Sequence, residues 1–372
     1  MGVDEVFDVL IVGGGPAGTA TAISTLKNID LRVVIIEKKS KHYRKPCGGL
    51  LTPICKELFE DTLQIEIPDS VFSNPPTLGL YYVPPSGWKA GGAVPNYQLL
   101  NIERDRFDSW LLNQSAKEGA EVLEHTRYLG FEADPSSYLV KLRKGDEIIS
   151  VKTKVIIAAD GCRSSIRRAI FPERNETITV MQQKYDAERC NLVMDPFFYV
   201  FYGKKFTDIY AYLIFKEHDK VLVGTAAFTP IEKKSSKGLF LKQFRRIFLN
   251  FLSETQNVTF SLPESVESWP IPFFPPVFGR GEVLLVGDAG GFCNSFTGEG
   301  IRFALECGIT AGECIAKWFA RADNSLRTLA KMYEIELESL EAYIRKMQVF
   351  TRELTDQTLE GLVRDSLKKR WN

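Results

Sequence analysis

The stretch Asp8-Val9-Leu10-Ile11-Val12-Gly13-Gly14-Gly15-Pro16-Ala17-Gly18 decides the fold of this 372-residue chain, because an apolar strand runs into a glycine-rich turn that opens a helix. Gly13 permits the tight turn, Gly15 lets the backbone approach a pyrophosphate, and Gly18 lets the helix pack close to the sheet. A second apolar run ends at Glu37, nineteen residues beyond Gly18, where a carboxylate can accept hydrogen bonds from ribose hydroxyls. This order predicts a dinucleotide site without choosing between NAD and FAD. The remaining predicted contacts of this segment are Pro16, Ala17 and Lys38.

Composition narrows the class of protein. With 44% hydrophobic and 12% aromatic residues the chain can form a large core, and its length allows two or three domains. Forty-seven basic residues balance forty-seven acidic ones, so we expect no nucleic-acid partner. Seven cysteines without a CxxC pair and only three histidines argue against a disulfide framework and against a metal site. No signal-peptide pattern or apolar run of about 18 residues occurs, so we expect a cytoplasmic protein that touches a membrane only peripherally.

A basic segment follows Glu37, since five of the eight residues from Lys38 to Lys45 are Lys or Arg. It leads into Cys47-Gly48-Gly49, a glycine pair that favours close backbone approach. Gly48 and Gly49 could lie against a flat ring while Arg44 or Lys45 faces phosphate oxygens. The alternative interpretation is a turn beside a solvated run of charges.

The middle of the chain alternates between two kinds of structure. An amphipathic helix is expected to open near 101–112, where Arg104 is either a cofactor contact or a surface cap. Short strands are expected at 121–123, 128–133, 138–143 and 148–151. A fully apolar strand at 154–159 then ends in Asp160-Gly161, as a buried parallel strand does when its carboxyl end faces a ligand.

The last part of the chain returns to this pattern after a second domain. From 182 to 267 the pattern favours antiparallel strands, with one helix at 237–254. Another buried strand then ends in Gly287-Asp288, and the loop Gly298-Glu299-Gly300-Ile301 opens a helix whose N-terminus can stabilise negative charge on a cofactor ring. Three strand ends, at Val12, Ala159 and Val286, are therefore expected to meet at one site.

These three motifs together resemble the flavoprotein fold of p-hydroxybenzoate hydroxylase. The resemblance implies an α/β architecture: a Rossmann-type FAD-binding domain, a second domain with an antiparallel sheet that holds the substrate, and C-terminal helices. It implies FAD bound without a covalent link. On the matching positions the expected FAD contacts are Gly13, Gly15, Gly18, Glu37, Arg104, Asp160, Gly161, Gly287 and Asp288.

Within that fold the sequence is similar to the geranylgeranyl reductase family, and to its CbrA-type branch. Lys45-Pro46-Cys47-Gly48-Gly49-Leu50 matches the family's cysteine-glycine signature, and the segment 294–301 matches its N-P-x-T-G-E-G-I loop, which implies that Cys47, Gly48, Gly49, Gly298, Gly300 and Ile301 contact the flavin. A third element, YxWxFPK, is only half present. The segment 210–216 keeps Tyr210 and Lys216 but has Tyr212 where the family has Trp. This departure lies in the element that is expected to face the substrate.

The resemblance implies an FAD-dependent enzyme that reduces carbon-carbon double bonds of an isoprenoid lipid. Such a reaction needs a hydride donor, a proton source and a long apolar channel. Cys47 and Tyr210 are the candidate proton sources, although Cys47 could equally be a buried packing thiol. An aromatic hydroxylase and a flavin-binding protein without turnover remain alternatives. The electron donor stays open between NAD(P)H and ferredoxin.

The expected organisation is discontinuous. Residues 1–70, 99–178 and 276–322 form the FAD-binding domain, residues 71–98 and 179–275 the substrate domain, and residues 323–372 a C-terminal helical segment. In that segment Leu337, Ile344 and Leu354 are spaced for core packing. The terminal run 368–371 carries three charges that allow weak contact with anionic lipid. We expect a monomer.

Overall fold

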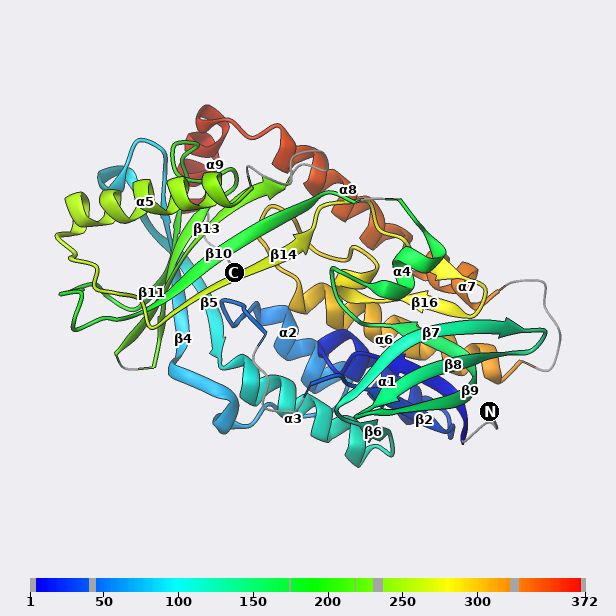
Figure 1. Cartoon of the computed structure of the whole chain (residues 1–372). Helices are drawn as coiled ribbons and strands as arrows, with labels where there is room; N and C mark the ends of the chain where they lie inside the picture. Colours follow the sequence, from blue (N-terminus) through cyan, green and yellow to red (C-terminus); the bar gives the residue numbers. More distant parts are fainter. Residues whose placement is uncertain are drawn as a thin grey trace.

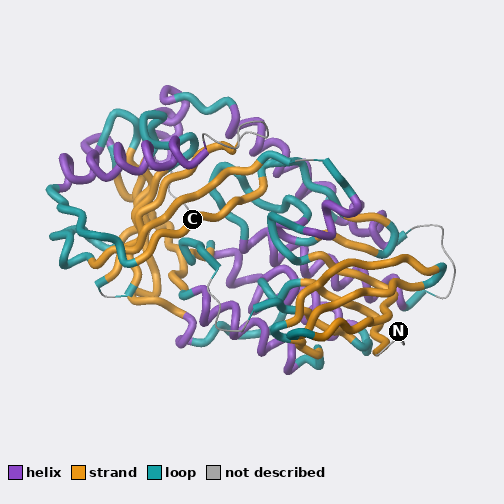
Figure 2. Tube along the Cα trace, viewed as in Figure 1, coloured by secondary structure: helices purple, strands orange, loops and turns teal. Residues whose placement is uncertain are grey.

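The computed structural model describes residues 5–39, 45–173, 175–217, 219–229, 237–321 and 328–368, which form two sheets with helices packed on them (Figures 1 and 2). The first sheet contains β1 (Glu5–Val12), β2 (Val33–Ile36), β6 (Glu121–Leu123), β7 (Thr126–Asp134), β8 (Ser137–Lys144), β9 (Glu147–Ala158), β15 (Gly279–Arg280) and β16 (Val283–Leu285). The second contains β3 (Leu50–Leu51), β4 (Phe72–Val83), β5 (Gly92–Ile102), β10 (Thr177–Asp186), β11 (Phe197–Phe201), β12 (Ala211–Lys216), β13 (Lys220–Thr229) and β14 (Ser265–Pro272). The α-helices are α1 (Pro16–Asn28), α2 (Pro53–Glu57), α3 (Arg104–Lys117), α4 (Ser165–Ile170), α5 (Lys237–Gln256), α6 (Ile301–Phe319), α7 (Leu329–Glu336), α8 (Glu338–Arg352) and α9 (Asp356–Lys368).

The centre of the first sheet is parallel and has the order β16-β9-β1-β2-β6. Val12 pairs with Ala158, and Ala158 pairs with Leu285, so the carboxyl ends of β1, β9 and β16 lie side by side. This confirms that the three strand ends far apart in the sequence meet at one edge. Ligands bind outside this edge in open α/β sheets.

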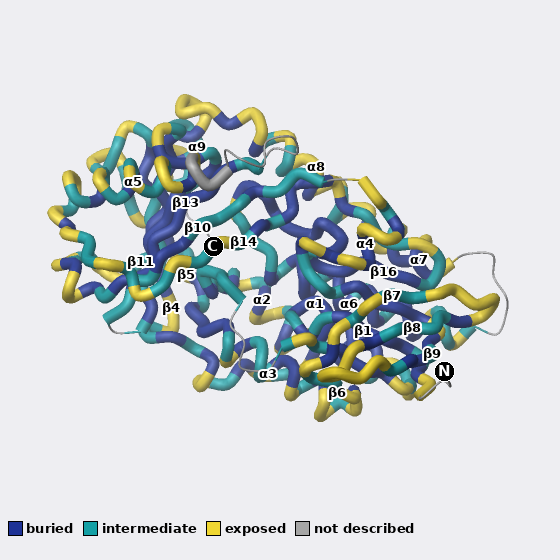
Figure 3. Tube along the Cα trace, in the orientation of Figure 1, coloured by how far each residue is buried: buried dark blue, intermediate teal, exposed yellow. Residues whose placement is uncertain are grey.

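Helices cover one face of this sheet and a β-meander covers the other. α1 and α6 pack together against side chains such as Val9, Ile11 and Ile157, which are fully buried. Strands β7 and β8 fold over the opposite face, where Leu10, Ile156 and Val140 are buried. In Figure 3 many buried residues lie in the part of the molecule that contains α1, α6 and β1. A sheet covered on both faces explains why its strands are apolar throughout.

The second sheet has the order β14-β10-β13-β12-β11-β4-β5-β3 and is antiparallel except for the pair β11 and β4. These two strands are joined through α3 and the first sheet rather than by a hairpin, so parallel pairing is sterically possible. α5 covers its outer face, where Phe248 and Leu252 are fully buried. α9 lies in the same half of the molecule, and α8 runs between it and the first sheet, where Ile344 of α8 joins the core (Figure 1). The inner face is turned toward the first sheet.

Some elements differ from the sequence-based expectation. The strands expected at 148–151 and 154–159 are one strand, β9, because its first part pairs with β8 while its second part pairs with β1. α3 begins at Arg104 rather than near 101. Leu337, Ile344 and Leu354 are buried, as expected of core positions. β3 and the end of β5 belong to the second sheet although both fall within the ranges assigned above to the FAD-binding domain, and the division into domains stays a prediction. Arg44 and the run 369–371 lie outside the described residues.

Candidate active site between the two sheets

A single cavity of about 760 Å³ lies between the edge of the parallel strands and the inner face of the second sheet. Its volume is in the upper part of the range of roughly 300–1,000 Å³ that is typical of ligand sites. Of the predicted residues that the structure describes, Gly18 alone does not line it. The lining includes Gly13, Gly15, Pro16, Ala17, Glu37, Lys38, Cys47, Gly48, Gly49, Arg104, Asp160, Gly161, Gly287, Asp288, Gly298, Gly300, Ile301 and Tyr210.

The glycine turn after β1 has close contacts at two of its glycines and open space at a third. Gly13 has φ +116°, and a Cβ there would lie 2.3 Å from the carbonyl oxygen of Ala159. A Cβ on Gly18 would lie 2.0 Å from the Gly13 oxygen, so α1 can pack this close only with glycine. A Cβ on Gly15 would meet nothing within 4 Å, which leaves open space beside the N-terminus of α1. Backbone N–H groups and the helix dipole favour an anion there.

Glu37 directly follows β2, and its carboxylate accepts a hydrogen bond from the glycine turn. Its Oε2 accepts a hydrogen bond from the Gly14 N–H at 2.8 Å, and its Oε1 accepts one from the Lys39 N–H at 3.0 Å. A carboxylate has about four acceptor sites, so Glu37 retains acceptor capacity for ribose hydroxyls.

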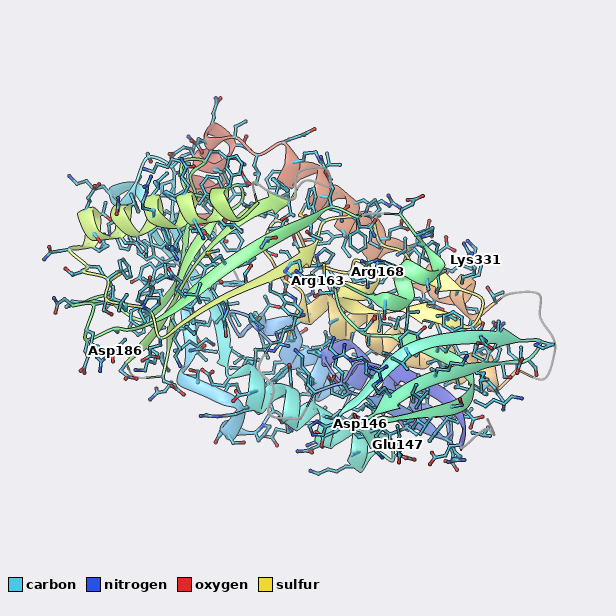
Figure 4. The ribbon with its side chains drawn as sticks, viewed as in Figure 1. Asp146, Glu147, Arg163, Arg168, Asp186 and Lys331 are labelled. Carbon is cyan, nitrogen blue, oxygen red and sulfur yellow. The ribbon has the colours of Figure 1, made fainter. Side chains whose placement is uncertain are left out.

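Asp160 follows β9 and has one oxygen available. Its Oδ2 accepts from the N–H and the hydroxyl of Ser165, at 2.7 and 3.0 Å, while Oδ1 is buried and has no partner among the described residues. A buried acceptor without a donor is costly, so this oxygen fits a hydroxyl or N–H donor from a ligand. Arg163, just before α4, and Arg168, on α4, are exposed and also line the cavity; both are labelled in Figure 4.

Asp288 follows β16 and pairs with Lys45. Lys45 Nζ donates to Asp288 Oδ2 at 3.1 Å. Burial alone would lower the pKa of Lys45, but the Asp288 carboxylate outweighs burial and the pKa is raised. Lys45 therefore stays charged at this end of the cavity. Gly300 directly precedes α6, so a second helix N-terminus also faces the cavity.

Arg167 is a site-building residue that sequence reasoning missed. It is 5% exposed, and its guanidinium donates to the carbonyl oxygens of Cys162 and Ala289 at 2.7 and 2.8 Å. These bonds tie the loop after β9 to the loop after β16. The sequence has arginines at 163, 167 and 168, but no sequence pattern indicates which of them is buried.

Cys47 lies where the two halves of the cavity meet, next to a buried arginine. Arg104 is 4% exposed and donates to both oxygens of Asp108, at 3.1 and 2.9 Å, which excludes the surface-cap interpretation. The Gly49 N–H donates to Cys47 Sγ at 3.4 Å. Burial alone would raise the pKa of the Cys47 thiol, but Arg104, the Gly49 N–H and Lys45 outweigh it and the pKa is lowered. This thiol therefore gives up its proton more readily than an ordinary cysteine.

Lys216 holds the Cys47-Gly48-Gly49 loop in place from the second sheet. It is 2% exposed, and its Nζ donates to Gly49 O at 3.1 Å, Ile102 O at 2.8 Å and Asn101 Oδ1 at 2.5 Å. Gly49 has φ +65°, and a Cβ there would lie 2.3 Å from Ile102 O. The tight glycine turn and the buried lysine thus fix the position of Cys47.

The far part of the cavity is walled by the inner face of the second sheet. Apolar side chains predominate there, among them Leu80, Leu99, Ile178, Val180, Phe198, Val200, Ile214 and Ala226. Tyr210 donates its hydroxyl to the Thr297 carbonyl oxygen at 2.6 Å, and burial raises its pKa. The proton of Tyr210 is therefore held by the loop before α6, which makes Tyr210 a weaker candidate acid than Cys47.

The residues present fit FAD. The open space at Gly15, the partnerless Oδ1 of Asp160 and two helix N-termini suit an anionic dinucleotide, and the cavity continues beyond them. Within the described ranges no three His, Cys, Asp or Glu residues lie close enough together to hold a metal ion. Among the same residues no helix is long and apolar enough to cross a membrane.

Comparison with known proteins assigns the chain. The FAD binding domain family matches residues 6–331. The digeranylgeranylglycerophospholipid reductase of Methanococcus vannielii is 30% identical over 88% of this chain and 82% of its own length, and protein CbrA of Escherichia coli O6:H1 is 26% identical over 90% and 88%. The crystal structure of a geranylgeranyl bacteriochlorophyll reductase-like protein from Thermoplasma acidophilum superposes with a TM-score of 0.82 at 24% identity, covering 98% of this chain and 92% of that one. The chain therefore belongs to the geranylgeranyl reductase group of the FAD binding domain family and is an FAD-dependent oxidoreductase.

Proposed function

We propose that this protein reduces carbon-carbon double bonds in the chain of an isoprenoid lipid. The observation that carries the proposal is the single cavity that joins the dinucleotide end to an apolar wall, with Cys47 at the junction. The name of the Methanococcus relative, a digeranylgeranylglycerophospholipid reductase, supports the same substrate class.

In the proposed reaction Cys47 is the proton donor. Bound in this cavity and reduced, FAD would supply the hydride for one alkene carbon, and the Cys47 thiol would give its proton to the other. The thiolate that remains is stabilised by Arg104 and the Gly49 N–H, and a proton from solvent restores it. The apolar wall excludes water, so the alkene meets a single proton source.

The test is an anaerobic half-reaction. The flavin of the purified holoprotein is reduced by light, and geranylgeraniol is then added. We expect the yellow absorbance of oxidised flavin to return while the lipid gains two hydrogens per double bond, as seen by mass spectrometry. Flavin that stays reduced over hours would exclude the reductase. A hydroxylated product formed only in the presence of oxygen would assign the protein to the hydroxylases of this fold instead.

A further inference from the structure

One row of residues on the inner face of the second sheet is polar. Glu267 on β14 pairs with Gln182 on β10, Gln182 pairs with Gly224 on β13, and Gly224 pairs with Tyr212 on β12. Directly paired residues share a face of a sheet, and the side chains of Glu267, Gln182 and Tyr212 all line the cavity. We call these three residues the polar stripe.

The polar stripe is joined by two hydrogen bonds. Tyr212 Oη donates to Gln182 Oε1 at 2.8 Å, and Gln182 Nε2 donates to Glu267 Oε2 at 2.7 Å. The phenol reaches Gln182 by crossing over Gly224, where a Cβ would lie 2.1 Å from Cζ of the tyrosine ring. Glycine at 224 is therefore a condition of the arrangement.

The direction of these bonds follows from Glu267. An ionised carboxylate only accepts hydrogen bonds, so the NH₂ group of Gln182 faces it and the amide oxygen faces Tyr212. The Tyr212 proton is thereby held by Gln182. Burial raises the pKa of Tyr212, which keeps the phenol protonated. Toward the cavity, the Tyr212 oxygen can then act only as an acceptor.

The surroundings make this acceptor selective. Neighbouring positions on the same face, such as Val180, Ala226 and Ile214, are apolar. Trp269, two residues beyond Glu267 on β14, also lines the cavity, and its buried Nε1–H has no acceptor among the described residues. The Nζ atoms of Lys45 and Lys39 lie 5.6 and 6.0 Å from the centroid of the Trp269 ring, so the wall is cationic beside Trp269 and apolar around Tyr212.

We propose that the polar stripe forms the subsite for the polar end of the substrate, and that the Tyr212 oxygen accepts a hydrogen bond from a substrate hydroxyl there. A hydroxyl can donate to the Tyr212 oxygen, which a methyl ether cannot do. The choice of an isoprenoid alcohol as substrate rests on the function proposed above.

Equilibrium dialysis against the oxidised holoprotein tests the subsite without turnover. The probes are geranylgeraniol and its methyl ether. We expect the alcohol to bind about tenfold more tightly than the ether. Tyr212→Phe removes only the oxygen, so it should reduce the affinity for the alcohol to that for the ether and leave the ether unchanged.

Tyr199→Phe is the matched control. Tyr199 is also buried in this sheet but faces the opposite side, where its hydroxyl donates to Asp195 O, so its loss should not change the affinity for any probe. Equal binding of alcohol and ether by the wild type would overturn the proposal. So would a Tyr212→Phe protein that loses affinity for both probes equally, or for FAD instead. The proposed function fails separately, if bound alcohol never reoxidises the reduced flavin.

Discussion

At the scale of single residues, the proposed reaction depends on Cys47 and on the groups that lower its pKa. A thiol next to a buried guanidinium is a good proton donor, because the thiolate it becomes is already stabilised. The same arrangement predicts a pH dependence. The acid must be protonated to act, so alkene reduction should fall as the pH rises through the Cys47 pKa, which lies below the ordinary value of 9.0.

Replacement of Cys47 tests this role. Cys47→Ala should reduce the rate of alkene reduction on the order of a hundredfold or more, because a positioned proton donor is lost. FAD content and photoreduction should be unchanged. Cys47→Ser keeps a proton at nearly the same place, so its rate of alkene reduction should lie between those of the wild type and the alanine variant. Single-turnover reoxidation of the flavin measures all three proteins, and an alanine variant with the wild-type rate would leave Cys47 a packing thiol and return attention to Tyr210.

Asp288 is predicted to serve the cofactor rather than the substrate. It follows β16 at the edge where the strand ends meet, and its carboxylate holds Lys45. Asp288→Ala should weaken FAD binding about tenfold or more, because a charged hydrogen-bonding group is lost and the half-buried Lys45 is left without its carboxylate partner. Titration of the apoprotein with FAD measures the change. A variant with unaltered FAD affinity and a weaker substrate constant would place Asp288 on the substrate side.

At the scale of elements, the contact between α1 and α6 depends on small residues. A Cβ on Gly312 would lie 2.5 Å from Cβ of Ser24, and a Cβ on Gly308 would lie 2.5 Å from the oxygen of Ala17. Ser24 Oγ also donates to the Ile309 oxygen at 2.9 Å. The two helices can pack this closely because glycine occupies both contact points.

Gly312→Val should therefore lower the free energy of unfolding by about 1–3 kcal/mol, since the added side chain forces the helices apart. Gly361→Val on α9 is a suitable control. Its Cβ would meet only the end of the Arg364 side chain, at 3.9 Å, so valine should leave stability unchanged or slightly higher. Urea denaturation followed by circular dichroism compares the two variants. Equal losses would show that the α1 and α6 contact tolerates separation.

The elements that could be predicted from the sequence are those whose signals are local. A short segment of sequence is enough to recognise the turn at Gly13, the acid at Glu37 and the apolar strands before Asp160 and Asp288. Parallel pairing of the strands then brings these features together. The polar stripe has no local signal. Gln182, Tyr212 and Glu267 lie on three strands, and only the register of the sheet and the gap at Gly224 place them in contact. Arg167 was missed for the same reason, because its partners are carbonyl oxygens of distant loops.

At the scale of the whole molecule, bound FAD should stabilise both sheets. The cavity is lined by residues of both, so a ligand that binds only the folded state favours the complete assembly. We expect added FAD to raise the Tm of the apoprotein. At about a hundredfold excess over its Kd, FAD should add about 2.7 kcal/mol to the free energy of unfolding. Heat or acid should then release free yellow flavin, as expected without a covalent link. Flavin that stays with the precipitated chain would contradict this.

The interleaving of the two sheets also sets the order of events on the ribosome. The glycine turn at Gly13 emerges early, but the edge beside it needs β9, and Asp288 comes only after β16. The second sheet begins with β3 and is completed by β14, so neither sheet closes until most of the chain has been made. Contacts so distant in sequence are slow to form. The nascent protein therefore cannot capture its cofactor in the fully formed site until after synthesis has passed α6, and a chain interrupted before that point leaves an incomplete pocket rather than a smaller enzyme.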